Sequence, residues 1–157
     1  MSDMDDAYKD KILEVENLNV EFSTYGGVVQ AVRGVNFSVG RGETLAIVGE
    51  SGCGKSVTVQ SIMGLIPTPP GKITAGEARL RGNNILNLPA KEANKFRGVE
   101  IGMIFQDPMT SLNPVFTCGD QVMEAIILHQ KLNKKDAKAL TIKLFEEVQL
   151  PTPERIF

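Results

Sequence analysis

The chain has 157 residues, a formal net charge of −2 and a pI near 5.5, and its 42% apolar content is ordinary for a globular protein with a real core. No stretch approaches the roughly 18 apolar residues of a membrane span, and the acidic balance without a basic cluster argues against nucleic-acid binding. Two cysteines and one histidine exclude a disulfide framework and show no metal-site spacing. The acidic, polar start is not a signal peptide, so a cytoplasmic location is expected.

The first elements along the chain are strand-like. Residues 11–22 and 28–39 are rich in β-branched and apolar residues on either side of a turn at 25–27, which predicts an antiparallel hairpin. Residues 43–48 form a short apolar run bounded by glycines, the pattern of a fully buried strand. A β-rich opening is therefore expected.

Strands then give way to helices. The elements expected after the hairpin and the first buried run are, in chain order, a helix from 54 to the prolines beyond 66, a strand at 74–85, a short helix at 88–98, a second buried strand at 99–105, and two amphipathic helices at 119–132 and 134–150.

The segment GESGCGKS at 49–56 fits the phosphate-loop pattern G-x-x-x-x-G-K-[ST], and it lies between a predicted buried strand and a predicted helix. Glycines let backbone N–H groups converge on a phosphate, and the helix N-terminus adds partial positive charge. Lys55 would reach the β- and γ-phosphates, and the Ser56 hydroxyl would ligate Mg²⁺. The residues expected to bind the nucleotide phosphates are Gly49, Glu50, Ser51, Gly52, Cys53, Gly54, Lys55, Ser56 and Val57.

A GTPase is one alternative, because residues 133–136 read N-K-x-D, a guanine-reading tetrapeptide. That tetrapeptide should close a buried strand, whereas here it joins two helical stretches. The sequence instead predicts Asn133 as a helix N-cap and Asp136 in the first turn, where a carboxylate suits the helix dipole.

Three stretches resemble the ATP-binding subunits of ABC transporters, most closely those of oligopeptide and dipeptide permeases: ENLNVEF, AVRGVNFSVGRGETLAIVGESGCGKS and IFQDPMTSLNPVFTCGDQV. The resemblance runs from about Ile12 to the last residue. It implies an α/β fold of the P-loop NTPase (ABC ATPase) type, with an N-terminal antiparallel β-subdomain, a partial RecA-like core and the start of a helical subdomain. The implied parts are a β-rich part at 12–48, the phosphate loop and helix at 49–66, a glutamine-loop region at 99–117 and the start of the helical subdomain at 118–157.

The resemblance also assigns Gln106, which ends the second predicted buried strand. Its side-chain oxygen would contact the Mg²⁺ or the attacking water, acting with Lys55 in catalysis as a switch that moves with the membrane subunit. A neutral amide can ligate weakly and release, so Gln106 is favoured over Asp107 as the metal contact. Residues 107–117 would line the contact with the transmembrane permease subunits.

Adenine requires an aromatic platform, which the family supplies from the first hairpin. Phe22 lies at the matching spacing before Lys55 and is expected to stack on the base, with Val32 packing nearby. Tyr25 is the alternative platform.

The implied function is ATP-driven import of oligo- or dipeptides, at the cytoplasmic face of the membrane, with a second ATP-binding subunit that is homologous or identical. The signature, Walker B and switch-histidine motifs are absent from the 157 residues, so the resemblance implies a truncated chain that does not hydrolyse ATP alone. Its two buried strands would lack parallel neighbours, which predicts exposed sheet edges or self-association. Two alternatives stay open: a complete, non-hydrolysing nucleotide-binding or interaction module, and a small P-loop kinase.

Overall fold

The computed structural model describes residues 11–107 and 111–157. The chain divides into two compact units, Met1–Arg97 and Gly98–Phe157. Part of the segment expected to contact the membrane subunits, at 108–110, lies outside the described residues.

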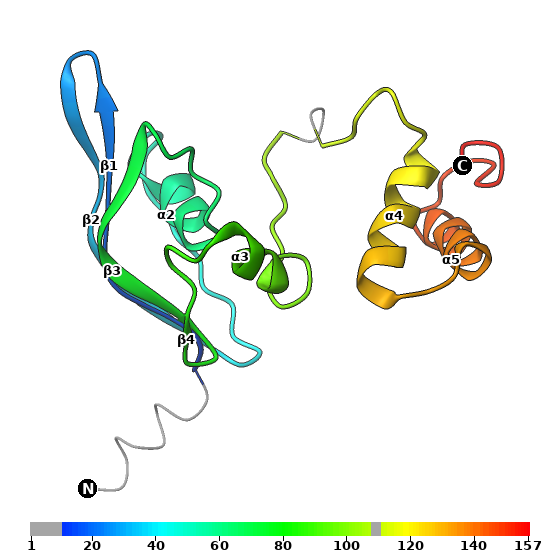
Figure 1. Cartoon of the computed structure of the whole chain (residues 1–157), viewed down its shortest axis with the longest axis horizontal. Helices are drawn as coiled ribbons and strands as arrows, with labels where there is room; N and C mark the ends of the chain where they lie inside the picture. The colour runs from blue at the N-terminus through cyan, green and yellow to red at the C-terminus, as the bar shows by residue number, and fades with distance from the viewer. Residues whose placement is uncertain (1–10, 108–110) are drawn as a thin grey trace, which may run out of the picture. The chain divides into compact units, whose positions relative to one another are not determined.

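Unit 1 is built on a long antiparallel hairpin (Figure 1). Strand β1 (Lys11–Thr24) pairs with β2 (Gly27–Gly40), and the two-residue connection between them contains Gly26. Val20 faces Val32 across the pair. The predicted hairpin is confirmed, because each strand finds its partner a few residues away along the chain.

The sheet has four strands in the order β2-β1-β3-β4. Strand β3 (Gly71–Leu80) runs antiparallel to β1, and the short β4 (Asn83–Asn84) folds back on β3. The strand predicted at 74–85 is confirmed in place, but it starts earlier and is interrupted at Arg81 and Gly82, where both φ angles are positive. Two consecutive residues with positive φ are typical of the centre of a tight hairpin turn, so the chain reverses there.

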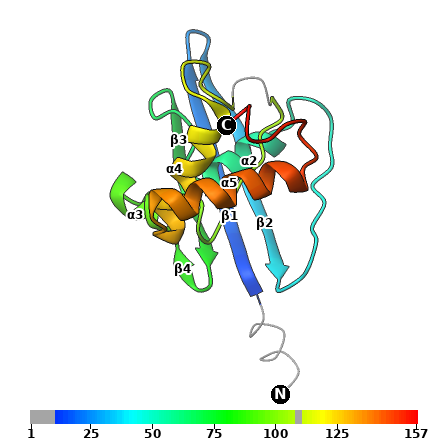
Figure 2. The ribbon, with the colours of Figure 1, turned by 90° about the vertical axis from the view of Figure 1, so that its right-hand side faces the viewer.

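Helix α2 (Lys55–Ile62) packs against β1 and β2 and is followed after β4 by the short helix α3 (Ala90–Phe96) (Figure 2). Both predicted helices are found, but α2 ends at Ile62 and not at the prolines beyond 66, because Gly64 has a positive φ that ends the helix first. The core of this unit is made of apolar side chains from the sheet, α2 and the connections beside it: Val15, Leu18, Val20, Val32, Ile62, Met63, Ile66, Ala78, Leu80, Ile85 and Leu86.

The two predicted buried strands are wrong. Residues 43–48 have no strand structure and are exposed, with Val48 at 89% and Leu45 at 42%. In the second predicted strand, at 99–105, residues 99 and 100 form a turn and Ile101 forms a single bridge. Residues 102–105 have no strand structure, and Ile104 is 98% exposed. A buried parallel strand needs neighbours on both sides, and within 11–107 and 111–157 neither segment has one. The exposed sheet edges predicted for these segments are not found, because neither segment belongs to the sheet, although several of their apolar side chains are exposed. Self-association stays a prediction.

Unit 2 contains two helices, α4 (Cys118–Gln130) and α5 (Lys134–Glu147), which pack on each other (Figure 1). Their shared core contains Met123, Ile126 and Ala137. Both predicted helices are confirmed, because each has apolar residues at helical spacing on the buried face.

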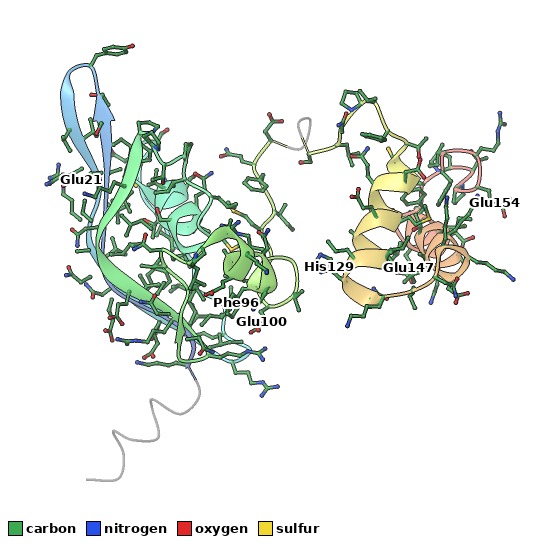
Figure 3. All side chains as sticks on the ribbon, in the orientation of Figure 1. Glu21, Phe96, Glu100, His129, Glu147 and Glu154 are labelled. Atoms are coloured by element: carbon green, nitrogen blue, oxygen red, sulfur yellow. The ribbon has the colours of Figure 1, made fainter. Side chains whose placement is uncertain are left out.

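Capping residues begin both of these helices. The Asn133 side chain accepts a hydrogen bond from the Asp136 N–H at 3.0 Å, and Thr117 does the same for Asp120 at 3.1 Å. The predicted N-cap at Asn133 is therefore confirmed. His129 lies near the end of α4 and is exposed, also as expected (Figure 3). No helix in the described part of the chain is long and apolar enough to cross a membrane.

Candidate functional site

The phosphate-loop residues lead directly into α2, which begins at Lys55. Gly54 is the N-cap and has φ 92° and ψ 2°, a left-handed conformation that favours glycine. The first N–H groups of a helix have no partner within the helix and carry its partial positive charge. No acidic side chain lies in the first turn of α2 to neutralise that charge. An anion is therefore favoured at this end of the helix.

Two glycines of the loop have close neighbours at the place where a side chain would begin. A Cβ on Gly54 would lie 2.4 Å from the Ala31 carbonyl oxygen and 3.8 Å from a methyl carbon of Val32. A Cβ on Gly49 would lie 2.7 Å from the sulfur of the exposed Cys53 side chain, which can rotate away. Glycine is therefore required at Gly54, where the neighbour is backbone and φ is positive.

Lys55 is folded back over this loop. Its ammonium donates hydrogen bonds to the carbonyl oxygens of Gly49 and Glu50, each at 2.7 Å, and lies 3.7 Å from the Cys53 sulfur. These bonds hold a positive charge beside the N-terminus of α2. A lysine ammonium and converging N–H groups suit the charge of a nucleotide phosphate chain.

Ser56 follows Lys55 in the first turn of α2 and is exposed, so its hydroxyl is accessible to a bound cation. Within the described residues no group of three or more His, Cys, Asp or Glu side chains could hold a metal. Mg²⁺ in phosphate-loop proteins needs no such group, since phosphate oxygens, water and a hydroxyl supply most of its ligands. The residues present therefore fit Mg²⁺ bound together with a nucleotide.

Sequence reasoning missed two buried hydroxyls of α2 that bond back to the preceding turn of the same helix. Thr58 is 5% exposed, and its hydroxyl donates to the Gly54 carbonyl at 2.9 Å. Ser61 is fully buried, and its hydroxyl donates to the Val57 carbonyl at 2.6 Å. The available signal was their spacing, since a hydroxyl four residues after a carbonyl can bond back to it within a helix.

A cavity of about 430 Å³ opens between the phosphate loop and β2. Gly52 and Cys53 contribute the loop side. Val32 lines it and is only 4% exposed. Its place beside the nucleotide stays a prediction. Sequence reasoning missed the other β2 residues that line this cavity: Val29, Gln30, Ala31, Arg33 and Val35.

Phe22, the predicted base platform, is half-buried opposite Val29 and Gly71 in the sheet. A Cβ on Gly71 would lie 3.0 Å from Cε1 of the Phe22 ring, so the ring packs over that glycine. Phe22 is not among the residues that line the cavity. Tyr25, the alternative, is fully exposed at the hairpin turn. Base stacking by either ring stays a prediction.

Gln106 lies in a bend of unit 2 and is exposed, whereas Lys55 belongs to unit 1. The bend follows the unpaired residues 102–105, so the strand predicted to deliver Gln106 is absent. Contact of Gln106 with Mg²⁺ or water stays a prediction.

Comparison with known proteins decides the family. The family model described as ABC transporter matches residues 32–155, which include the phosphate loop, α2 and both helices of unit 2. The chain belongs to the ABC transporter family. This membership favours an ABC-type ATPase over the GTPase and kinase alternatives.

Curated relatives in this family carry peptide-transport names. The chain is 54% identical over 145 residues to the oligopeptide transport ATP-binding protein OppD of Bacillus subtilis, covering 92% of this chain and 40% of the relative. It is 53% identical over 144 residues to the dipeptide transport ATP-binding protein DppD of the same organism, covering 92% and 43%. Against OppD of Escherichia coli it is 49% identical over 142 residues, covering 90% and 42%. The chain therefore spans less than half the length of these relatives.

Solved structures confirm the fold class. A dimeric, post-hydrolysis structure of the ATP-binding cassette MJ0796 bound to ADP and Pi matches with a TM-score of 0.75 at 23% identity, covering 89% of this chain and 58% of the other. The cbiO1 protein of Clostridium perfringens matches with a TM-score of 0.57 at 27% identity, covering 83% and 47%. The chain has the P-loop NTPase fold of ABC ATPases, starting with an antiparallel β-sheet.

Proposed function

We propose that this chain is part of the ATP-binding subunit of a peptide importer, in which ATP binding and hydrolysis drive transport of oligo- or dipeptides. The observation that carries this proposal is Lys55, held by two carbonyl oxygens over a loop that approaches β2 closely at Gly54. The names of the relatives, which are oligopeptide and dipeptide transport ATP-binding proteins, support the choice of cargo.

The phosphate loop supplies the binding chemistry. The Lys55 ammonium neutralises phosphate charge, and the N–H groups at the start of α2 donate to phosphate oxygens. Mg²⁺, when bound with the nucleotide, would neutralise further phosphate charge, and the hydroxyl of Ser56 and the amide oxygen of Gln106 would be its protein ligands. Because both of these protein ligands are neutral, most of the charge of Mg²⁺ would act on the phosphates.

The nucleoside end of ATP is assigned to the hairpin side of the loop. The cavity beside Gly52 and Cys53 is bounded by β2, and Val32 gives it an apolar floor. Phe22 is the proposed stacking residue, although its ring packs over Gly71, so it must contribute an exposed edge or rotate. Tyr25 is the alternative platform, and it is unhindered at the turn.

The partners are transmembrane permease subunits and a second ATP-binding subunit, homologous or identical, at the cytoplasmic face of the membrane. The permease contact is assigned to 107–117. Within the described part of this segment, Leu112 is 48% exposed, Val115 82% and Phe116 60%. Three neighbouring exposed apolar side chains favour a protein contact over a purely solvated loop.

The phosphate-loop proposal is tested with Lys55→Ala and isothermal titration of Mg-ATP into this chain. Removing the ammonium should weaken binding at least about tenfold, since a charge-assisted contact is worth about 1.5 to 3 kcal/mol. Lys91→Ala, in an exposed helix position, is the matched control and should bind like the parent. Equal affinities for the parent and Lys55→Ala would refute the proposal.

The catalytic proposal is tested with Gln106→Ala in the complete protein within its transporter. ATP affinity should stay near that of the parent, while transport-coupled hydrolysis should fall about tenfold or more. The control is Gln130→Ala, at an exposed position at the end of α4. Normal coupling in Gln106→Ala would rule out the switch role, and a complete protein that binds but never hydrolyses ATP would support the non-hydrolysing module.

A further inference from the structure

Arg97 makes a two-pronged contact with the C-terminal end of α2, the helix that begins with the phosphate loop. Its Nε donates to the Met63 carbonyl at 2.8 Å, and its Nη2 donates to the Gly64 carbonyl at 2.7 Å. Its Nη1 donates to the Asn94 side chain at 3.3 Å. The side chain is half-buried, and its carbonyl partners lie more than 30 residues away along the chain.

The end of α2 has a particular need for such a partner. The Gly64 and Leu65 N–H groups already return to the carbonyls of Ser61 and Gln60, as in a Schellman cap. The Met63 and Gly64 carbonyls accept from Arg97, and the last turn of α2 contains no basic residue of its own. Arg97 therefore brings from elsewhere the positive charge that a helix C-terminus favours.

The shape of the site is also specific for this contact. Gly64 has φ +63°, and a Cβ there would lie 2.6 Å from Nη2 of Arg97. Glycine thus provides both the left-handed turn and the room for the guanidinium. The planar fork of arginine can meet two carbonyls at once, which a lysine ammonium on a flexible stem does less well.

Arg97 has a distinctive place along the chain. It is the last residue of unit 1, directly after α3, and Gly98 begins the unit that contains Gln106. Its side chain therefore holds the point at which the chain leaves the phosphate-loop unit. Gln106 follows nine residues later, a stretch that can span up to about 30 Å when extended. A loose starting point would widen the range of positions open to Gln106.

We propose that Arg97 is a positioning residue for ATP hydrolysis, which ties the start of the Gln106 segment to the C-terminal end of the phosphate-loop helix. The proposal rests on the proposed function, because it assumes that Gln106 acts on the nucleotide bound at the other end of α2. Arg97 contacts the Met63 and Gly64 carbonyls and the Asn94 side chain. It acts through the backbone that it holds.

The first experiment tests the contact itself and requires no nucleotide. Urea unfolding midpoints of the full chain are compared for Gly64→Ala, Arg97→Ala and the double variant. Gly82→Ala is the matched control, because Gly82 has φ +80° and nothing within 4 Å of an added Cβ. Gly64→Ala should lower the midpoint more than Gly82→Ala does, since it adds a collision with Arg97 to the same backbone strain.

When Arg97 is already alanine, Gly64→Ala should lower the urea unfolding midpoint only as much as Gly82→Ala does, because the collision with Arg97 is gone. Arg41→Ala, which removes an exposed arginine, should leave the extra loss unchanged. Strictly additive effects of Gly64→Ala and Arg97→Ala would show that the contact is not made, and would overturn the proposal.

The second experiment separates positioning from simple stabilisation. In the complete protein, at a temperature where all variants are folded, Arg97→Ala should lower kcat about tenfold and change the Kd for Mg-ATP less than about twofold. Arg97→Lys should recover part of the lost kcat, because it keeps the charge but meets one carbonyl. It also serves as the test variant if Arg97→Ala does not fold.

An unchanged kcat, or equal losses in kcat and nucleotide affinity, would overturn the positioning role. A parent protein that hydrolyses no ATP would instead refute the proposed function. In that case the unfolding comparison still decides whether Arg97 holds the end of α2.

Discussion

Residues 28–39 and residues 43–48 have similar apolar, β-branched compositions, yet only the first segment forms a strand. Strand β2 pairs with β1, its neighbour across a tight turn, so its backbone groups are satisfied locally. Residues 43–48 have no such neighbour and are exposed. The difference teaches that an apolar run becomes a strand only where hydrogen-bonding partners are within reach.

The largest effect on stability is expected from a substitution in the core of the sheet, compared with one in the unpaired residues 43–48. Leu18 is fully buried in β1, so Leu18→Ala should destabilise the chain by about 2.5 to 5 kcal/mol. Val48 is 89% exposed, so Val48→Ala should change stability by less than about 0.5 kcal/mol. Urea unfolding monitored by circular dichroism measures both. Similar losses for the two variants would mean that residues 43–48 are packed in solution.

A second test concerns the contact between the phosphate loop and the hairpin. Gly54→Ala should cost about 2 to 4 kcal/mol, because it combines a left-handed backbone with a collision at the Ala31 carbonyl. Gly42→Ala, at φ +73° with nothing within 4 Å, isolates the backbone term and should cost about 1 kcal/mol. Equal unfolding midpoints for the two variants would indicate that the loop does not press on β2.

A third test addresses a helix whose start depends on local residues alone. Asn133→Ala removes the N-cap of α5 and should cost about 1 kcal/mol, since the Asp136 N–H loses its partner. Lys135→Ala, in the first turn and exposed, is the control and should be nearly neutral. The comparison uses thermal unfolding. If Asn133→Ala leaves the unfolding temperature unchanged, the stability of α5 comes from its packing on α4 and not from the N-cap.

The smallest effect on stability is expected from substitutions in the unpaired segments, 43–48 and 102–105. The same substitutions should have the most direct effect on self-association. Val48→Lys combined with Ile104→Lys should leave the unfolding midpoint within about 0.5 kcal/mol of the parent, because both side chains are exposed. Self-association, measured by analytical ultracentrifugation, should decrease as the apolar surface gains charge. Ser23→Lys with Gln130→Lys adds the same charge at exposed polar positions and should not reduce it. Equal self-association in both double variants would exclude these segments as the contact.

The sequence predicted the elements that depend on near neighbours. The hairpin, α2, α4, α5 and the cap at Asn133 were all expected, because turn glycines, helical spacing and a capping side chain act over a few residues. The phosphate loop was also expected, since its motif specifies backbone conformation directly. The prediction of two buried strands was wrong, because the pattern of apolar residues identifies an apolar run but not whether a neighbouring strand is present to pair with it.

For the candidate site, too, some features could be predicted from the sequence and others could not. The sequence identified the residue types for phosphate binding, including Lys55 and its glycines. It could not show that Gly54 lies against the Ala31 carbonyl. It also placed Phe22 at the base by spacing, whereas the structure has the ring over Gly71 and outside the lining of the cavity.

By itself, the sequence predicted a phosphate-binding loop, because glycine, lysine and serine at this spacing suit the charge and shape of a phosphate chain. Its resemblance to the ABC transporter family rested on two further stretches outside that loop. The tertiary structure alone decided which apolar runs are paired, which β2 residues border the phosphate loop, and that Arg97 holds the far end of α2. These features join residues far apart along the chain. Such contacts depend on where the folded backbone places two segments, which no local pattern encodes.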